Sequence, residues 1–380
     1  MNNIGNQRHK FDIPDDVSYL DCATMSPLLL SSYEATRVGL QFKLHPWLVK
    51  SEDFFNEAEQ VREIVGRLIN TQSDNIALIP GASYGVALAA ANIPIQSGQE
   101  VLILESQHTA NAYSWMHYSK QVGAKIRVLK RPNQLNWTEI VLEAIGAKTA
   151  VAALPCVHSS DGSELDLTRI SIRLREFGAA LVLDATHSIG ATNIDINSVQ
   201  PDFLVAAGYK WLLGPYGTGI MYVAPKWQQG RPLEEPGLNR LGSSNFVENL
   251  SYLENYIDGA RRYDVSSRGN FGLIQGLRNS LQQIESWGIH SIAKELTSIT
   301  TAIADKVKQI DLPGMVGAVA HGHYLSIEFL EQLPIDLIHQ LERDKVYVSA
   351  RGRWLRLTPY LHNSERDVES LFKAITACGK

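Results

Sequence analysis

The sequence predicts an α/β protein that has a large domain built on a mostly parallel sheet and a smaller α+β domain at its C-terminal end. Between about residues 75 and 225, apolar runs of strand length alternate with segments of helical periodicity. This pattern is typical of a parallel sheet that helices cover on both faces. Towards the C-terminus the pattern shortens to a compact αβαββα unit. With 380 residues, 44% of them hydrophobic, the chain is long enough for a large core and two domains.

The first 20 residues are polar, and we expect them to form an arm (residues 1–20) that packs with the small domain and carries a short strand at residues 17–20. This segment lacks the apolar core of a signal peptide, and no later run reaches membrane-spanning length. Pro27 suits the first turn of a helix over residues 28–44. A second helix is expected over residues 53–69, where Phe54, Ala58 and Val61 recur at helical spacing.

The large domain is expected over residues 21–285. Its strands are expected at residues 75–80, 100–105, 125–129, 149–154, 181–183 and 203–207. Its helices are expected at residues 86–93, 112–122, 137–145, 167–177 and 272–287. Because strands and helices alternate, successive strands are expected to run parallel in one sheet.

The small domain is expected over residues 286–380. It is predicted to contain a helix over residues 291–309, a helix over 335–343, and strands at 324–329, 346–350 and 354–358. Asn363 or Ser364 can cap a final helix that runs to Cys378, because acidic residues follow in its first turn.

Polar side chains follow five of the predicted strands: Ser83, His108, Ser159, Asp184 and Lys210. The C-terminal ends of parallel strands meet at one rim of the sheet, where open α/β proteins bind their ligands. Taken singly, each residue has a structural explanation. Ser83, for example, could cap the helix after the glycine-containing turn, although the same turn could also hold an anion. Together the five residues indicate a site.

Asp184 and Lys210 carry the chemistry that this site suggests. Lys210 has apolar neighbours in the sequence, and desolvation lowers the pKa of an amine until the free base is accessible near neutrality. A lysine that forms a Schiff base requires this. The alternative is a strand-end aspartate and a lysine whose stem alone is buried, which are common in α/β proteins. Spacing alone leaves both interpretations open.

Arg356 lies inside an otherwise apolar predicted strand, in the run Trp-Leu-Arg-Leu-Thr-Pro. An arginine in that position must be paired or must face a ligand anion. The alternative is a surface arginine on an edge strand, which the nearby Pro359 permits.

Composition excludes several classes of partner. The net charge of −5 argues against a nucleic acid as the main ligand. The three cysteines, Cys22, Cys156 and Cys378, are far apart and form no CxxC pair, so neither a disulfide framework nor a metal site is expected. We therefore expect a protein of the reducing cytoplasm that binds a small molecule and neither a membrane nor a metal.

With these residues assembled, the chain resembles the class V aminotransferases of pyridoxal-phosphate fold type I, a family that includes cysteine desulfurases, kynureninases and isopenicillin-epimerase-like enzymes. The resemblance covers nearly the whole length. Its main elements are Asp-Ala-Thr-His-Ser-Ile-Gly at residues 184–190 and Gly-Tyr-Lys-Trp-Leu-Leu-Gly-Pro-Tyr-Gly-Thr-Gly at residues 208–219. It implies a seven-stranded type of sheet, pyridoxal 5'-phosphate as cofactor, and a homodimer with the site at the subunit interface.

The resemblance also implies a role for each candidate residue. Lys210 would form the Schiff base and move the proton at the substrate Cα, Asp184 would keep the ring nitrogen protonated, and His108 would stack on the ring. Arg356 would bind the substrate α-carboxylate. The other cofactor contacts would come from Ala82 and Ser83 at the phosphate, from Ser159, His187 and Tyr209 near the ring, and from Arg268 of the partner subunit.

The chain departs from its better-known relatives in three places. Ala207 removes one hydroxyl that others offer to the phosphate, Tyr209 replaces a histidine, and Arg268 stands where many members have threonine. Residues 350–354 contain no cysteine, although a desulfurase needs its nucleophilic cysteine there. Persulfide-forming desulfurase chemistry is therefore disfavoured.

We expect an enzyme that uses pyridoxal phosphate on an amino acid or amine, with transamination as the default because it needs only proton transfer by Lys210. The alternative is a lyase or an epimerase, such as a cysteine-lyase, kynureninase or isopenicillin-epimerase-like enzyme. A non-catalytic binding module is disfavoured because Asp184 and Lys210 are both present. A Rossmann-type nucleotide enzyme is disfavoured because no glycine fingerprint follows the first strands.

Overall fold

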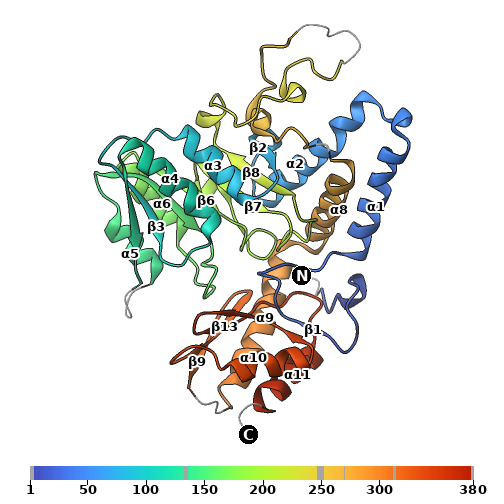
Figure 1. The fold of residues 1–380 in the computed structure, drawn as a ribbon, viewed down its shortest axis with the longest axis vertical. Coiled ribbons are helices and arrows are strands. Elements are labelled where there is room, and N and C mark those ends of the chain that lie inside the picture. The colour runs from blue at the N-terminus through green and yellow to red at the C-terminus, as the bar shows by residue number, and fades with distance from the viewer. Residues whose placement is uncertain (1–3, 132–135, 246–251, 269, 311–313, 378–380) are drawn as a thin grey trace.

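The structure is a computed structural model that describes residues 4–131, 136–245, 252–268, 270–310 and 314–377. A large sheet surrounded by helices forms one part of the molecule, and a smaller sheet with the C-terminal helices packs at its end (Figure 1). None of the helices in these ranges has the length and apolarity needed to cross a membrane. Cys378, the predicted end of the last helix, lies outside the described residues.

The large sheet has seven strands in the order β2-β8-β7-β6-β5-β3-β4. The strands are β2 (Ile76–Ile79), β3 (Glu100–Leu104), β4 (Lys125–Leu129), β5 (Thr149–Pro155), β6 (Ala180–Asp184), β7 (Phe203–Ala207) and β8 (Gly219–Val223). β8 runs antiparallel to its neighbours β2 and β7, and the other neighbouring strands are parallel. The prediction of a mostly parallel sheet is therefore confirmed, although it omitted β8.

Helices cover both faces of this sheet. They are α2 (Asn56–Leu68), α3 (Ala82–Asn92), α4 (Tyr113–Val122), α5 (Trp137–Ala144), α6 (Leu167–Glu176) and α7 (Ile196–Val199), while α1 (Leu30–Leu44) and α8 (Phe271–Trp287) pack side by side at the end near β2 (Figure 1). Alternate residues of one strand enter opposite layers of the core: Leu102 and Leu104 join one apolar cluster, whereas Val101 and Ile103 join the other. This alternation is the period of two expected of a strand buried on both faces.

Two helix starts differ from the prediction. The segment predicted as a helix from residue 53 begins with a 3-10 turn, Ser51–Phe54, and α2 starts only at Asn56. α3 begins at Ala82, immediately after Gly81 at the N-cap position. Ser83 therefore lies within the first turn of α3, and the interpretation of Ser83 as an N-cap is wrong.

The small sheet has four antiparallel strands in the order β12-β13-β10-β9. They are β9 (Met315–His321), β10 (Tyr324–Phe329), β12 (Ser349–Arg351) and β13 (Trp354–Leu357), and α9 (Ile289–Val307), α10 (Ile335–Arg343) and α11 (Glu365–Ala377) are the helices of this region. β9 was not predicted, because its partly exposed, glycine-containing sequence has no clear alternation. The strand predicted at residues 346–350 is divided between β11 (Val346–Tyr347) and β12, which pair with different partners.

The N-terminal segment contacts the small sheet region. β1 (Ser18–Tyr19) pairs in parallel with β11, and Asp21 forms an isolated bridge with Thr358. Leu20 is buried in the apolar cluster of the small domain. Residues just after the predicted arm are therefore held where the two sheets approach each other, while the domain limits at residues 20 and 285 stay a prediction.

Candidate active site

The five strand ends that the sequence singled out lie along one rim of the large sheet. A cavity of about 330 Å³ opens there, in front of the N-terminus of α3. Five of the predicted residues form part of its wall: Ala82, Ser83, His108, Tyr209 and Lys210. The other predicted residues lie around this cavity or further away, as described below.

Lys210 follows the end of β7 and is almost fully buried. Burial lowers the pKa of its amine to about 8, and the negative charge of Asp184 opposes part of that effect. The backbone around Lys210 is fixed by other segments, because the Ser26 N–H donates to the Tyr209 carbonyl at 3.1 Å. The free amine is therefore accessible near neutral pH at a fixed position.

A histidine contacts the Lys210 amine, and a tyrosine contacts that histidine. Lys210 Nζ lies 3.1 Å from His187 Nε2, and the Tyr324 hydroxyl is hydrogen-bonded to His187 Nδ1. Burial, together with the charge of Lys210, holds the pKa of His187 well below its ordinary value, so the ring is neutral. When Lys210 is charged it donates to Nε2. When it is neutral it can accept from Nε2–H, with the Tyr324 hydroxyl then donating to Nδ1.

Asp184 ends β6 and is held by the turn that follows it. Its Oδ1 accepts a hydrogen bond from the Thr186 N–H at 3.0 Å, and the Thr186 hydroxyl accepts from the Ala207 N–H at 3.1 Å. Gly190 has a φ of +96°, and a Cβ there would lie 2.1 Å from the Trp211 carbonyl oxygen. The segment after β6 is therefore packed, backbone against backbone, on the segment that carries Lys210.

His108 lies at the end of the β3 segment, where its Nδ1 accepts from the Ala110 N–H at 3.2 Å. Its ring centre is 6.1 Å from that of His187. Burial and the nearby Lys210 lower the pKa of His108, which favours the neutral ring. Two neutral imidazoles therefore lie in this region, His108 on the cavity wall and His187 against the Lys210 amine.

The turn from β2 into α3 presents the N-terminus of the helix to the cavity. The first N–H groups of an α-helix have no acceptor inside the helix, and its dipole favours an anion there. The first turn of α3 has no acidic side chain to occupy these groups. The backbone of Ala82 and Ser83 therefore forms part of a cradle suited to a phosphate.

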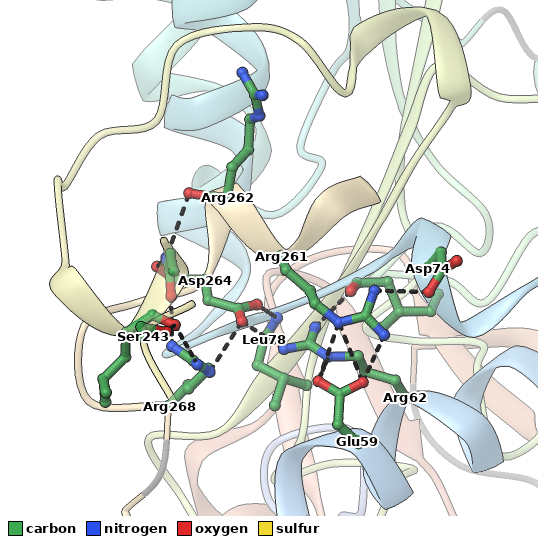
Figure 2. Close-up of polar contacts among 12 residues, drawn as sticks. Glu59, Arg62, Asp74, Leu78, Ser243, Arg261, Arg262, Asp264 and Arg268 are labelled. Carbon is green, nitrogen blue, oxygen red and sulfur yellow. Dashed lines mark hydrogen bonds and ion pairs between the residues drawn. The ribbon is translucent and has the colours of Figure 1, made fainter. Parts of the chain in front are cut away.

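A buried ionic cluster secures β2, the outer strand that leads into this cradle (Figure 2). Asp264 Oδ1 accepts a hydrogen bond from the Leu78 N–H at 2.8 Å, and its other oxygen is paired with Arg62 and, at 3.2 Å, with Arg268 Nε. Arg62 also donates to the Ile76 carbonyl at 2.5 Å. The free edge of β2 is therefore closed by side chains just before the turn at Gly81.

The side chain of Arg268 therefore makes its contacts within its own chain. Besides pairing with Asp264, it donates to the Leu238 carbonyl at 2.9 Å and is buried. The segment that contains Arg268 lies beside Pro80 and Gly217, on the side of the cradle-forming turn that faces away from the cavity. These contacts favour a role of Arg268 in holding β2, and its contact with the phosphate of a partner subunit stays a prediction.

Arg356 is fully buried and already paired. Its guanidinium donates to Ser349 Oγ at 2.9 Å, to the Ser159 carbonyl at 2.7 Å and to Thr24 Oγ1 at 2.9 Å, and it lies 3.4 Å from Asp21. β13 lies between β12 and β10, so Arg356 is on an inner strand. The alternative of a surface arginine on an edge strand is therefore wrong.

Comparison with known proteins identifies the family. Residues 48–363 match the family model described as aminotransferase class-V. This chain is a member of the aminotransferase class-V family. The expectation of a class-V aminotransferase-like enzyme of fold type I, made from the sequence motifs, is confirmed.

Curated relatives of this class-V protein are similar at low identity. A probable cysteine desulfurase of Pyrococcus abyssi is 24% identical over 296 residues, which cover 76% of this chain and 72% of the relative. A cysteine desulfurase of Escherichia coli (strain SE11) is 27% identical over 241 residues, 62% of this chain and 58% of the relative. The matched segment thus spans between about half and three quarters of these relatives.

Solved structures agree on the fold. The cystine C-S lyase C-DES in complex with its reaction product, cysteine persulfide, superposes with a TM-score of 0.85 at 16% identity, over 95% of this chain and 97% of the lyase. A second C-DES structure, with glycine covalently linked to the PLP cofactor, gives a TM-score of 0.86, over 97% of this chain and 99% of that protein. The seven-stranded sheet of this class-V protein is therefore that of fold type I.

Several residues of the site were not assigned from the sequence: Asp21, Thr24, Thr186, Tyr324 and Arg351. Thr186 lies inside the 184–190 element and could have been found there. The others come from the N-terminal segment or the small domain, and they reach the site through contacts between residues more than 100 positions apart, such as Thr24 with Arg356 and Tyr324 with His187. Of these others, only Asp21 and Thr24 had a signal in the sequence, because they are polar residues that follow the strand predicted at residues 17–20.

The cysteines of this class-V protein give no support to a cysteine nucleophile. Cys22 and Cys156 are buried, and burial raises the pKa of both thiols. The β12–β13 hairpin contains Arg351 and Arg353 in place of a cysteine. Within the described part of the chain, no thiol is therefore available at the position that a desulfurase uses.

Proposed function

We propose that this class-V protein is a pyridoxal-phosphate enzyme that removes a leaving group from the β-carbon of an amino acid. The observation that carries the proposal is the Lys210 amine, buried at a strand end with a pKa of about 8 and influenced by Asp184 from the neighbouring strand. The relatives that support elimination include a cystine C-S lyase. The missing cysteine in the β12–β13 hairpin argues against the persulfide chemistry of a desulfurase.

The residues present fit pyridoxal phosphate. The cavity of about 330 Å³ joins a helix N-terminus, which suits the phosphate, to the Lys210 amine, which suits the aldehyde. Ala82 and Ser83 would hold the phosphate, and the buried Asp184 would pair with the ring nitrogen. His108, Ser159, His187 and Tyr209 would surround the ring.

When bound, the cofactor supplies an electron sink for the charge that develops at the substrate Cα. Lys210 would then remove the Cα proton and return it, because the pKa of its amine, about 8, lies close to neutral pH. Arg356 would orient the substrate through its α-carboxylate. The neutral side chains of His187 and Tyr324 would hold the Lys210 amine on the side of the substrate Cα that carries the proton. The walls of the cavity would limit the access of water.

Elimination from Cβ is favoured over the transamination expected from the sequence. Transamination and elimination share the loss of the Cα proton, and they differ in whether a group then leaves Cβ with its bonding electrons. Among the similar proteins, C-DES is a cystine C-S lyase, which breaks a carbon–sulfur bond, and this supports elimination. An epimerase would need a second base on the opposite face of Cα.

The products of the reaction test this proposal. The cofactor-loaded protein is mixed with single amino acids, and the 2-oxo acid, ammonia and the amine form of the cofactor are measured. A lyase gives a 2-oxo acid and ammonia in equal amounts over many turnovers. Stoichiometric conversion of the cofactor to its amine form, without ammonia, would instead identify an aminotransferase, and an inverted substrate would identify an epimerase.

We also propose that the protein works as a homodimer with the cavity near the subunit interface. Supporting this, Tyr216 on the cavity wall is largely exposed, and α1 carries exposed apolar residues, among them Tyr33 and Leu40. Sedimentation at decreasing concentration, followed together with activity, tests the proposal. Full activity of a monomer would contradict it.

A further inference from the structure

Arg351 is a cation beside the site that lacks a carboxylate partner. It ends β12, and its guanidinium donates to the Ala350 carbonyl at 2.8 Å and to Thr24 Oγ1 at 3.4 Å. Both of these acceptors are neutral. Among the described residues, no carboxylate oxygen lies within 4.0 Å of it, whereas the neighbouring Arg353 is paired with Glu328 at 2.5 Å. A guanidinium placed this way can accept an anion from outside the chain.

Arg351 lies next to Arg356. Both guanidiniums donate to the same Thr24 hydroxyl, Arg351 at 3.4 Å and Arg356 at 2.9 Å. The one carboxylate of this group, Asp21, is 3.4 Å from Arg356. Of the two cations, only Arg356 is therefore paired with a carboxylate of the residues that the structure describes, and the positive charges of both lower the pKa of Lys210 after the larger effect of burial.

Arg351 also faces the larger cleft of the molecule. This cleft has a volume of about 740 Å³ and lies between the loops after β3 and β5 and the small sheet. Of its charged side chains, Arg131 is paired with Asp161, and Arg353 with Glu328. Glu105, also on the wall, forms no ion pair with Arg351. Arg351 thus lines a space that can hold a substrate side chain, and its charge also acts on Lys210.

We propose that the substrate is an amino acid whose side chain carries a second anionic group, and that Arg351 binds this group. The proposal rests on the proposed function, in which Arg356 receives the α-carboxylate. A substrate with two acid groups can pair with both guanidiniums, whereas a substrate with one acid group leaves one guanidinium without an anion. Binding of both arginines to the same α-carboxylate is the competing arrangement, and the experiment below separates the two.

Spectral titration of the cofactor-loaded protein tests the inference. Aspartate, glutamate and cysteate are compared with alanine, serine and cysteine, using wild type, Arg351→Gln and Arg351→Lys. We expect wild type to bind the acidic set more tightly. Arg351→Gln should lose at least about tenfold in affinity for the acidic set, a size typical of a charge-assisted contact, and little for the neutral set. Arg351→Lys should recover part of the loss.

Arg366→Gln is the matched control, because Arg366 is an arginine of the same small domain that is paired with Asp15 and lines neither the cavity nor the cleft. It should keep the preference for acidic amino acids. If Arg351→Gln weakens both sets equally, Arg351 binds the α-carboxylate and the inference is wrong. If wild type prefers neutral amino acids, the inference also fails while the proposed function stands. A protein that binds no cofactor overturns the proposed function, and the inference with it.

Discussion

Lys210 owes its reactivity to a balance between burial and charge. Burial lowers the pKa of the amine, Asp184 raises it, and Arg356 and Arg351 lower it again. Burial outweighs the opposing charge of Asp184, so the pKa of the amine falls to about 8 and the free base is accessible near neutral pH. The residues that surround Lys210 therefore set the pH at which it can act.

The pH dependence of cofactor loading follows from this balance. The free amine is the reactive form, so the rate at which the apo-protein takes up pyridoxal phosphate should rise with pH, with a midpoint near 8. Removing the negative charge in Asp184→Asn should move the midpoint to lower pH. Stopped-flow absorbance measures both. A midpoint near pH 10 would mean that Lys210 is not desolvated.

Tyr324 acts on Lys210 through His187, so it is a positioning residue. Tyr324→Phe removes the hydroxyl that contacts His187 Nδ1 and leaves that nitrogen without a partner, which should cost about 1–3 kcal/mol of stability. We also expect the midpoint of the cofactor-loading profile to move, because His187 loses its fixed orientation. Denaturant unfolding and stopped-flow loading measure the two effects. An unchanged loading profile would limit Tyr324 to a structural role.

At the scale of elements, the edge of β2 is the part most dependent on buried charge. Figure 2 shows two arginines around Asp264, with a second ionic group of Glu59, Arg261 and Asp74 beside them. Breaking a buried ion pair by removing one partner is costly, since the other charge stays buried. The strand that leads into the phosphate cradle is therefore held by a few polar side chains.

Asp264→Asn tests this dependence. It should leave Arg268 without a counter-charge and Arg62 with Glu59 alone, and destabilise the protein by about 3–5 kcal/mol, the usual effect for a buried pair. Denaturant unfolding of the apo-protein measures it. Glu34→Gln, which breaks the exposed pair with Arg37, is the control and should change stability by less than about 1 kcal/mol. We also expect Asp264→Asn to bind pyridoxal phosphate more weakly, and unchanged affinity would separate the cluster from the cradle.

Gly190 is a point of close approach between the 184–190 and 208–219 elements of the site. Gly190→Ala would put a Cβ 2.1 Å from the Trp211 carbonyl oxygen at a φ of +96°, so we expect a loss of at least about 2 kcal/mol in unfolding free energy. Gly146→Ala is the matched control, because nothing lies within 4 Å of its added Cβ. Equal unfolding free energies for the two variants would contradict the packing described here.

For the molecule as a whole, local signals in the sequence predicted most of the large sheet and the rim that carries the site. Apolar runs of strand length and the polar residues after them are local features, and the sheet topology then brings them together. The prediction omitted β9 because its partly exposed, glycine-containing sequence has no clear alternation, and it omitted β8 although residues 220–223 form an apolar run of strand length.

The small domain contributes what the sequence could not predict. Tyr324 contacts His187, and the charges of Arg356 and Arg351 act on Lys210, from strands that follow Lys210 in the chain by more than 100 residues. Thr24 contacts both arginines from the N-terminal segment. Such contacts depend on how the two sheets pack against each other, which the periodicity of the sequence does not predict. Arg356 was recognised only because an arginine in an apolar strand needs a partner.

The central claim is that Lys210 holds pyridoxal phosphate. Reduction of the cofactor-loaded protein with borohydride, followed by peptide mapping with mass spectrometry, tests it directly, because reduction makes the bond between cofactor and lysine permanent. We predict that the phosphopyridoxyl group is found on the peptide that contains Lys210, and that Lys210→Ala carries none. An unmodified Lys210 peptide, or modification of another lysine at the same stoichiometry, would contradict the claim.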